Sequence, residues 1–414
     1  MINFKTDFKD SFFYKNILIL LKGTVLAQII PLIISPFLTR LYSPKEFGVL
    51  ALFSSISVIL GSIVNGRYEQ ALVLIKTENE ARHLTILSLL ISLFMSLFLF
   101  FSTYLIDFFN ESDLAFWIYF IPIVVFSIGV YNTLNYYELR KKNFQNISNS
   151  EIYRSSSFAV VQLGFPLIKS GLFGLIIGKI ISSLIAPFYL WKISKFEIGK
   201  VNMSLILILA KKFIDFPKYT NISILLNNLS VNVINIMIPI LYSSSFLGLY
   251  SIMYKFLAAP FAFLGNSINQ VFLEEVVRQK NELGQAYKLT KRILIQLTLL
   301  SILIFGGIFF IIEDLFAFVF GDDWRMSGFY AKYLMPFFMF KFIVSPLTSI
   351  HTAFEKQKLS FNLQLIMFVL SMACLLYAHY KLLKFEQYLL LFSLLMSIFY
   401  IYRVIIILKI AKNH

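Results

Sequence analysis

Long apolar segments separated by short polar ones run along almost the whole chain. An apolar run of about 20 residues is long enough to cross a bilayer as an α-helix. Twelve such runs can be placed, six on each side of residue 200. They are expected at residues 17–38, 47–64, 84–108, 114–137, 150–168, 172–191, 219–241, 247–267, 293–313, 328–350, 360–380 and 387–408. The pattern predicts an all-α integral membrane protein with twelve transmembrane helices.

A short sequence repeat relates the two sets of six helices. The segment LYSPKEFGVLAL at 41–52 aligns with LYSSSFLGLYSI at 241–252, so Gly48 falls on Gly248. Transporters built from two similar halves usually bind their substrate between them. We therefore expect two six-helix lobes around a central cavity. The expected order is a cytoplasmic interfacial segment at 1–16, an N-terminal lobe at 17–192, a cytoplasmic linker at 193–216 and a C-terminal lobe at 217–414.

Basic residues are distributed unevenly over the segments between the apolar runs. Loops predicted to face one side hold about four times as many Lys and Arg residues as loops on the other side, and the basic side is normally cytoplasmic. This bias predicts that both termini lie in the cytoplasm. It also accounts for much of the net charge of +15, so we expect no nucleic-acid partner.

The sequence lacks the motifs of several enzyme classes. It contains no GxxxxGK[ST] phosphate loop, and its four histidines and single cysteine are not spaced as metal ligands. The predicted external loops are too short for a large catalytic loop. We therefore expect a transporter without metal or cofactor rather than an enzyme.

Cations occur inside the predicted spans, whereas no Asp or Glu occupies a span centre. A charge at mid-bilayer costs roughly 2.5–3.5 kcal/mol, so it usually faces a cavity or a partner unless its long side chain reaches the interface. Interfacial placement is favoured for Lys332 and Arg403, and a cavity for Lys179, Lys255 and Lys341. A transporter of organic cations would need a deep carboxylate, so the pattern favours an anionic ligand. The candidate anion-binding residues among them are Lys22, Arg154, Lys179 and Lys255.

Two polar stripes suggest contacts to sugar hydroxyls, which amides can both donate to and accept from. The seventh run carries asparagines on one helical face, and the fourth carries amides and tyrosines near its cytoplasmic end. The candidate sugar-binding residues are Asn132, Asn135, Tyr136, Asn221, Asn228 and Asn232. Helix–helix hydrogen bonding is an equal explanation for the asparagines. An interfacial aromatic belt is the alternative for the tyrosines.

The stretch from 22 to 74 resembles the N-terminal region of bacterial polysaccharide-biosynthesis flippases of the O-antigen or Wzx type. These belong to the superfamily that also contains multidrug and toxic-compound extrusion proteins and peptidoglycan lipid flippases. The matching residues are Lys22-Gly23, Ser35-Pro36, Thr39-Arg40-Leu41-Tyr42-Ser43-Pro44, Phe47-Gly48, Arg67-Tyr68-Glu69 and Ala71.

The resemblance implies a twelve-helix, two-lobed fold similar to that of the multidrug extrusion proteins. It also implies export of undecaprenyl-diphosphate-linked oligosaccharide, an O-antigen unit or similar, from the inner to the outer leaflet of the bacterial inner membrane. The implied partners are this lipid-linked oligosaccharide, membrane lipids, a polysaccharide polymerase and chain-length proteins. The candidate diphosphate-binding residues are then Lys22, Arg67, Arg154, Lys179 and Lys255. The sequence does not identify a coupling ion, H⁺ or Na⁺; Glu69 and Asp107 are the candidate coupling residues.

Two alternatives remain at this point. A cation-coupled multidrug exporter of the same fold would require a deep carboxylate. A membrane-embedded polysaccharide polymerase or ligase would require a large external loop with catalytic residues. Neither feature is evident in the sequence.

Overall fold

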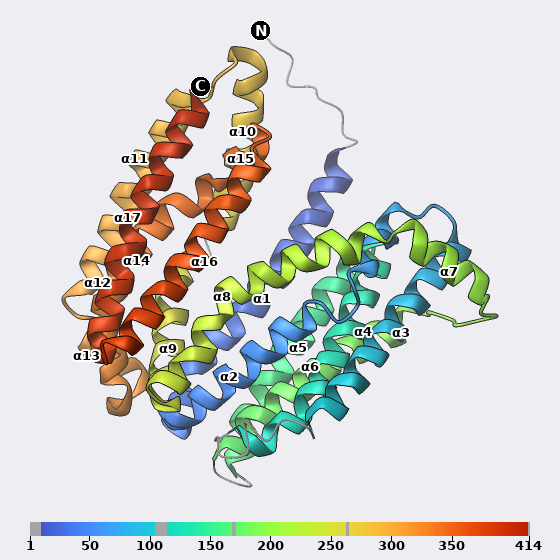
Figure 1. Cartoon of the computed structure of the whole chain (residues 1–414), viewed down its shortest axis with the longest axis horizontal. Helices are drawn as coiled ribbons and strands as arrows, with labels where there is room; N and C mark the ends of the chain where they lie inside the picture. Colours follow the sequence, from blue (N-terminus) through green and yellow to red (C-terminus); the bar gives the residue numbers. More distant parts are fainter. Residues whose placement is uncertain (1–9, 104–113, 168–170, 262–264, 413–414) are drawn as a thin grey trace. The chain divides into compact units, whose positions relative to one another are not determined.

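The computed structural model describes residues 10–103, 114–167, 171–261 and 265–412, which form helices joined by short turns (Figure 1). No β-strand occurs within these four ranges. The predicted all-α fold class is therefore confirmed. Most of the predicted interfacial segment at 1–16 lies outside the described residues.

Each of the twelve predicted spans coincides with helical structure. The helices of the first six spans are α1 (Asp10–Leu41), α2 (Pro44–Gly61), α3 (Glu78–Thr103), η3 with α4 (Ala115–Phe120, Ile121–Arg140), α5 (Phe144–Gly164) and α6 (Leu172–Ser194). Those of the last six are α8 (Asn221–Leu241), α9 (Ser244–Pro260), α11 with η7 and α12 (Tyr287–Ser301, Ile302–Gly306, Gly307–Phe309), α14 (Arg325–Val344), α16 (Gln357–Tyr380) and α17 (Phe385–Ala411).

Shorter helical elements connect the spans. They are η1 (Tyr68–Leu74), η4 (Phe165–Leu167), α7 (Met203–Lys212), η5 (Phe216–Thr220), α10 (Asn266–Leu283), α13 (Ile312–Phe320), η8 (Asp322–Trp324), η9 (Ser345–Ser349) and α15 (Ile350–Ala353). Helix α7 is not expected from the sequence pattern, which predicts a linker at residues 193–216.

Nine helices in the described part of the chain are long and apolar enough to cross a membrane. Helix α5 is long enough, with 21 residues, but it is not among these nine because it carries polar residues such as Glu151 and Arg154. It packs against both α1 and α6. Helix α9 is apolar but has only 17 residues.

The helices form two compact units. Unit 1 comprises Met1–Tyr42 and Val49–Asn232, and unit 2 comprises Ser43–Gly48 and Val233–His414. The first turn of α2 thus belongs to unit 2, whereas the rest of that helix belongs to unit 1.

Small residues bring the helices of unit 1 close together. A Cβ atom on Gly178 of α6 would lie 2.5 Å from Cγ of Gln162 on α5, and one on Gly174 would lie 2.1 Å from the Tyr42 hydroxyl oxygen. The Tyr42 hydroxyl donates a 2.8 Å hydrogen bond to the Gln162 carbonyl. The Gly-xxx-Gly spacing of α6 therefore permits the close helix packing that is common in membranes.

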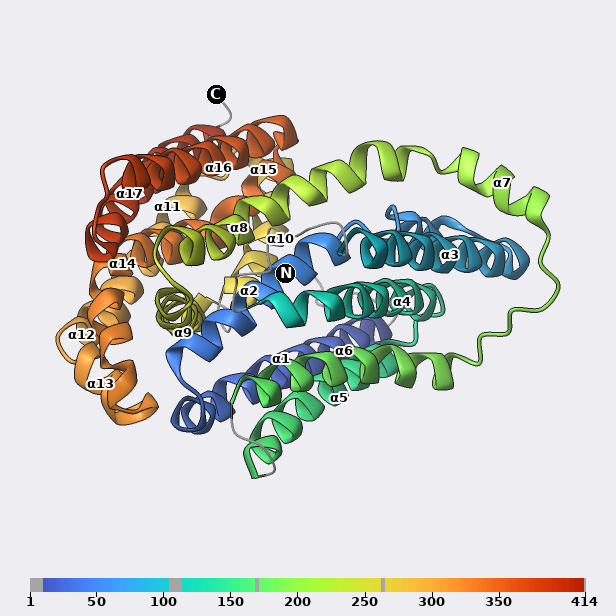
Figure 2. The same ribbon diagram turned by 60° about the horizontal axis from the view of Figure 1, so that its bottom comes forward.

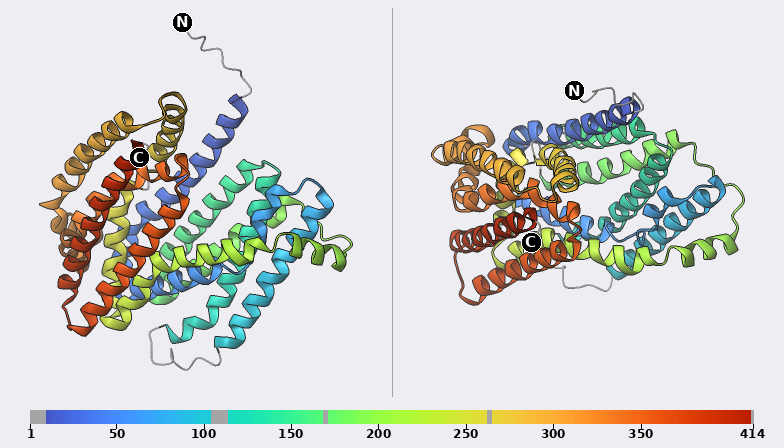
Figure 3. Two further views of the ribbon diagram at one scale, coloured as in Figure 1. Left: turned by 45° about the horizontal axis from the view of Figure 1, so that its top comes forward. Right: turned by 90° about the horizontal axis from the view of Figure 1, so that it is seen from above.

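Aromatic side chains dominate the core of unit 2, where α14 lies alongside α17 (Figure 3). The Phe385 ring lies 5.2 Å from Tyr242, 4.8 Å from Phe246 and 5.0 Å from Tyr330, centroid to centroid. Such edge-to-face and tilted arrangements are the favourable ones for aromatic pairs. The aromatic cluster joins the start of α9 to α14 and α17.

The repeated serines begin two helices in the same way. The Ser43 hydroxyl lies 3.4 Å from the Glu46 amide, and both the amide and the hydroxyl of Ser43 donate to the Glu46 carboxylate, at 2.7 and 2.9 Å. The Ser243 hydroxyl accepts from the Phe246 amide at 3.4 Å. A serine at this position satisfies one of the free amides of the first turn, and Ser43 with Glu46 forms a reciprocal capping box.

The repeated glycines meet within unit 2, where the first turn of α2 packs against the first turn of α9. A Cβ atom on Gly48 would lie 1.7 Å from the Ser244 carbonyl oxygen, and one on Gly248 would lie 1.7 Å from the Pro44 carbonyl oxygen. The contact is reciprocal, because Pro44 and Ser244 occupy matching positions of the repeat. Only residues without a Cβ permit this backbone approach, so the repeat encodes a helix crossing.

Candidate functional site

A polar cluster links α4 and α5 within unit 1. The Tyr131 hydroxyl donates to the Glu151 carboxylate at 2.5 Å, and the Asn135 amide donates to the Tyr131 hydroxyl at 3.2 Å. Arg154 forms an ion pair with Glu151, one helical turn earlier. The guanidinium carbon of Arg154 lies 5.3 Å from the Tyr131 ring centroid. Glu151 and Tyr131 therefore hold the arginine in place, and the Arg154 side chain remains 42% exposed.

A second cation, Lys179 of α6, approaches this cluster. Its charge interacts electrostatically with that of Arg154. Within the described residues no carboxylate forms an ion pair with Lys179, whereas Arg154 is paired with Glu151. The cluster is consequently electropositive, and a bound anion would relieve the repulsion between Arg154 and Lys179.

Aromatic side chains that the sequence interpretation missed lie beside the cluster. The Tyr153 and Tyr189 rings are 4.8 Å apart, and the Asn149 amide donates to the Tyr189 hydroxyl at 3.3 Å. Tyr153 is 50% exposed. Asn149 and Tyr153 are one turn apart on α5, just before Arg154, and this spacing is the signal that could have revealed them.

A separate cluster surrounds η1. Arg67 has a left-handed backbone, with φ of 62°, and its Nη1 lies 3.5 Å from Oε1 of Glu69. Glu69 is only 1% exposed, and no group among the described residues hydrogen-bonds its other carboxylate oxygen. Burial raises the pKa of the Glu69 carboxyl, although a backbone hydrogen bond and the Arg67 charge oppose this shift. Tyr136 lies near enough to interact electrostatically with both residues.

Some side-chain amides of the asparagines on α8 already hydrogen-bond to the backbone of the same helix. The side-chain amide of Asn228 donates to the Ile224 carbonyl at 3.1 Å, and that of Asn232 donates to the Asn228 carbonyl at 3.0 Å. The Asn221 side-chain oxygen is buried without a hydrogen-bond partner among the described residues. Acceptor oxygens thus remain for a ligand, while two of the amide donors are already used.

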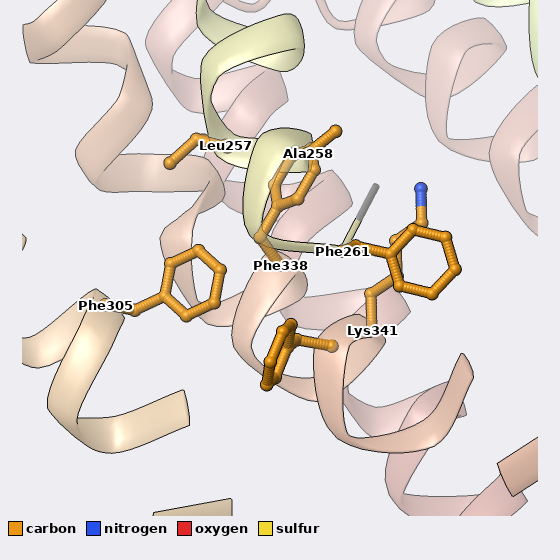
Figure 4. Close-up of a pocket in the computed structure, with 7 residues that line it drawn as sticks. Leu257, Ala258, Phe261, Phe305, Phe338 and Lys341 are labelled. Atoms are coloured by element: carbon orange, nitrogen blue, oxygen red, sulfur yellow. The ribbon is translucent and has the colours of Figure 1, made fainter. Parts of the chain in front are cut away.

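Lys341 of α14 lies among aromatic side chains in unit 2. Its Nζ donates to the Tyr254 hydroxyl at 2.7 Å and lies 5.0, 5.5 and 5.4 Å from the ring centroids of Tyr254, Phe337 and Phe338. These are cation–π distances. The lysine borders a pocket with space for about one water molecule, roughly 10 Å³, which Figure 4 shows among phenylalanine rings. The sequence interpretation placed Lys341 deep in the membrane but omitted it from the candidate site.

The other predicted cations have varied surroundings. Lys255 is half-buried on α9, next to Tyr254. Lys332 forms a 2.7 Å ion pair with Glu313. The expectation that Arg403 reaches the interface is wrong, because its side chain is buried inside unit 2 and its guanidinium carbon lies 5.4 Å from the Tyr400 ring centroid.

Three further predicted residues are placed less completely. Lys22 lies on α1, and its side chain is outside the described part of the structure, as is all of Asp107. Asn132 is half-buried on α4.

An apolar groove of about 400 Å³ lies between α10 and α11 in unit 2. It is lined by Ile268, Val271, Phe272, Ile293, Gln296, Leu297 and Leu300. Gln296 is the polar member of this lining, so the groove suits a hydrocarbon chain better than a sugar.

A family model for polysaccharide biosynthesis proteins matches residues 37–328. The chain belongs to this family. The match extends from the end of α1 to the start of α14 and includes the polar clusters of unit 1. It also confirms the family resemblance seen in residues 22–74. No curated protein matches the sequence.

Solved structures show the fold. A lipid II flippase MurJ in an inward closed conformation is 14% identical, with a TM-score of 0.69 over 96% of this chain and 87% of that one. An inward-facing multidrug resistance MATE family transporter of the MOP superfamily is 11% identical, with a TM-score of 0.65 over 95% and 98%. A MOP superfamily transporter from Pyrococcus furiosus, described as having reverse polarity of its binding pocket, is 12% identical, with a TM-score of 0.54 over 95% and 94%. The predicted MATE-like transmembrane fold is confirmed.

Proposed function

We propose that the protein is a flippase that moves undecaprenyl-diphosphate-linked oligosaccharide from the inner to the outer leaflet of the bacterial inner membrane. It works by alternating access, with both termini in the cytoplasm. Family membership supports a role in polysaccharide biosynthesis. The observation that carries the choice of an anionic cargo is the cluster of Arg154 and Lys179, in which Glu151 pairs with Arg154 and Lys179 has no ion-pair partner among the described residues.

Arg154 and Lys179 bind the diphosphate in this proposal. A guanidinium can donate two parallel hydrogen bonds to phosphate oxygens, and an ammonium adds a compact charge. The bound diphosphate competes with Glu151 for Arg154. Lys22, Arg67 and Lys255 are the further candidate cations along the path of the diphosphate.

The sugars contact aromatic and amide side chains near these cations. Tyr153 offers an exposed ring beside Arg154, and Asn135 lies within the same hydrogen-bonded cluster. The remaining candidates are Asn132, Tyr136, Asn221, Asn228 and Asn232. The groove between α10 and α11 provides an apolar surface for the polyprenyl chain.

The membrane potential supplies a driving force. An anion that leaves an inside-negative cell gains about 2.3 kcal/mol per charge for each 100 mV. Glu69 is the candidate for proton coupling, because its buried carboxyl can accept and release a proton close to Arg67. Asp107 is the second candidate, and Na⁺ the alternative coupling ion.

The main alternative is a multidrug exporter, since the MATE likeness shows the same fold. Such an exporter requires a carboxylate that can hold an organic cation. Within the described residues of α4 and α5, Glu151 already binds Arg154 and Tyr131, and the buried Glu138 accepts from the Asn146 amide. These occupied carboxylates favour the anionic cargo.

The test is complementation of a bacterial strain that lacks its O-unit flippase. We expect the protein to restore polymer at the cell surface and to lower the amount of lipid-linked intermediate on the inner leaflet. Arg154→Gln, Lys179→Gln and Lys255→Ala should each abolish this rescue at normal protein levels. Arg325→Gln is the matched control, because this cation pairs with Asp314 in an exposed position and should leave rescue intact.

Three results would contradict the proposal. Intermediate that still accumulates while drug resistance rises would indicate a drug exporter. Polymer made by the protein from intermediate already outside would indicate a polymerase. Full activity of Arg154→Gln and Lys179→Gln would remove the cluster from the substrate path.

A further inference from the structure

Helix α7 lies between two segments that are long and apolar enough to cross a membrane, Leu172–Ser194 and Phe216–Leu241. It has ten residues, Met203–Lys212, and Asn202 caps its first turn by accepting from the amides of Ser204 and Leu205. Eight residues separate its start from the preceding segment and three separate its end from the following one, so short stretches of chain tie both of its ends to the spans. Its sequence MSLILILAKK combines apolar residues with two lysines at one end.

One face of α7 is fixed to unit 1. Ile206 and Leu209 are 3% and 1% exposed and belong to a hydrophobic cluster with residues of α3 and η1. Figure 2 shows α7 beside α3. The backbone amide of Asn202 donates to Nε2 of His83 at 3.0 Å, and the Tyr68 hydroxyl donates to the Ala210 carbonyl at 3.1 Å. The helix therefore has a defined orientation on unit 1.

The opposite face of α7 leaves large apolar side chains uncovered. Leu207 and Ile208 are 57% and 60% exposed, and Met203 is 59% exposed. At 100° per residue Leu207 and Ile208 lie opposite Ile206 and Leu209, and Met203 lies beside that buried face. Exposed apolar area costs about 25 cal/mol for each Å² that remains in water, so a contiguous patch of this kind normally has a partner.

Lysines share this outward face. Lys211 and Lys212 are exposed at the end of α7, and Lys200 and Lys218 are exposed in the flanking segments. Apolar and basic side chains on one helical face are typical of helices that lie in the interface of an anionic membrane. Each such lysine contributes about 1 kcal/mol of attraction to acidic lipid headgroups.

We infer that the outward face of α7, comprising Met203, Leu207, Ile208, Lys211 and Lys212, docks on an anionic phospholipid surface. The apolar side chains enter the boundary between headgroups and acyl chains, and the lysines bind lipid phosphates. The position between two spans, the uncovered apolar side chains and the adjacent positive charge all favour this occupant. By the proposed topology, the surface is the cytoplasmic leaflet.

Docking of α7 would also restrain the residues of the cluster around η1. Tyr68, which hydrogen-bonds to α7, stands between Arg67 and Glu69 in the sequence. A lipid surface that holds α7 in place thus restrains the segment carrying both residues.

The test uses the full-length protein in lipid nanodiscs with single spin labels. Cys374 is the one cysteine of the chain and is buried, so Cys374→Ala provides the background. We expect labels at Leu207→Cys and Ile208→Cys to be more accessible to oxygen than to a water-soluble nickel chelate. Gln285→Cys, in an exposed turn, is the matched control and should show the reverse. Nickel accessibility at 207 and 208 equal to that at 285 would overturn membrane docking and indicate a soluble partner for this face.

A second measurement tests whether docking depends on the charges of Lys211 and Lys212. Hydrogen exchange of residues 203–212 is compared in nanodiscs of phosphatidylcholine alone and with added phosphatidylglycerol. We expect exchange to be up to roughly 30-fold slower with the acidic lipid, a factor of about five for each of the two lysines. Lys211→Gln with Lys212→Gln should remove this difference without lowering the melting temperature, because neither lysine belongs to the buried face. Equal exchange in both lipids would overturn the requirement for anionic headgroups.

Discussion

The two copies of the repeat, at 41–52 and 241–252, use the same residues to build the same backbone. Ser43 and Ser243 each cap the helix that follows, although only Ser43 has a reciprocal acidic partner. Gly48 and Gly248 each lie against a carbonyl of the other copy. The repeat thus specifies the starts of α2 and α9 and their crossing.

The side chains around this crossing differ between the copies. The Tyr42 hydroxyl donates to the Gln162 carbonyl in unit 1, whereas the Tyr242 ring packs against Phe385 in unit 2. Further along, Ser55 is buried on α2, while the matching position on α9 is the half-buried Lys255. The comparison teaches that the backbone framework is repeated and the chemistry is not.

The largest expected effect comes from breaking the shared crossing. Gly48→Ala and Gly248→Ala should each destabilise the protein by at least about 3 kcal/mol, because the new methyl group meets backbone that no rotamer change can move. Gly164→Ala and Gly307→Ala are matched controls, since a Cβ atom there meets no heavy atom within 4 Å. The measurement is the melting temperature in detergent. Tolerance of alanine at 48 and 248 would show that the helices do not cross at these glycines.

The tyrosines should respond differently to loss of their hydroxyls. Tyr42→Phe removes a buried hydrogen bond and should cost about 0.5–1.5 kcal/mol. Tyr242→Phe retains its ring contacts and should cost less than half as much. Urea unfolding of both variants tests this difference. Equal losses would mean that the two tyrosines have equivalent surroundings.

The serine caps should differ by a smaller amount. Ser43→Ala and Ser243→Ala each remove a cap, which typically costs about 1 kcal/mol. Ser43→Ala should cost more, because Glu46 also loses its hydrogen bonds to the serine hydroxyl. Thermal unfolding of both variants, beside Ser102→Ala as a control at an exposed position, gives the comparison. A larger loss for Ser243→Ala would contradict the capping box at Ser43.

The smallest expected effect is a change in how the melting temperature depends on pH. It is expected for Glu69 in one half and not for the matching position in the other half. Glu69 is buried near Arg67, whereas Asn269 stands 200 positions later and donates to the Pro346 carbonyl. Burial raises the pKa of Glu69, so its stabilising contribution is complete below the ordinary pKa and is lost as the pH rises through the native pKa.

Glu69→Gln removes this titration. The melting temperature of the variant relative to the unaltered protein should therefore rise as the pH increases above about 4.5, the ordinary pKa of a glutamate. Asn269→Asp in the other half and Glu282→Gln at an exposed site are the comparisons, measured between pH 4 and 8. A constant difference across this range would show that the Glu69 pKa is not raised in the folded protein.

Local patterns identified much of the framework. Apolar runs of the right length predicted every span, because the bilayer imposes the same requirement on each helix. They did not predict α7, because ten residues are too few to give a membrane-span signal. The end of the eighth span was also misplaced: the predicted run at 247–267 includes the first residues of α10, whose later turns are polar.

The candidate site was only partly predictable. Glu151 and Arg154 are one turn apart, so helical periodicity already brings them together. Tyr131 lies 20 positions before Glu151, and Tyr254 lies 87 positions before its partner Lys341. No local spacing in the sequence connects such residues. The sequence therefore predicts that Lys341 lies deep in the membrane but does not predict the aromatic rings around it.

The sequence by itself determined the membrane class, the twelve helices, the repeated caps and the glycines that permit a close crossing. These features depend on transfer to lipid, helix periodicity and the absence of a Cβ atom, all of which are properties of a few neighbouring residues. Tertiary structure decided which charges are neutralised. It gave Lys332 an acid, placed Lys341 among aromatic rings and buried Arg403. These outcomes depend on distances between helices, since electrostatic and ring interactions weaken within a few ångströms.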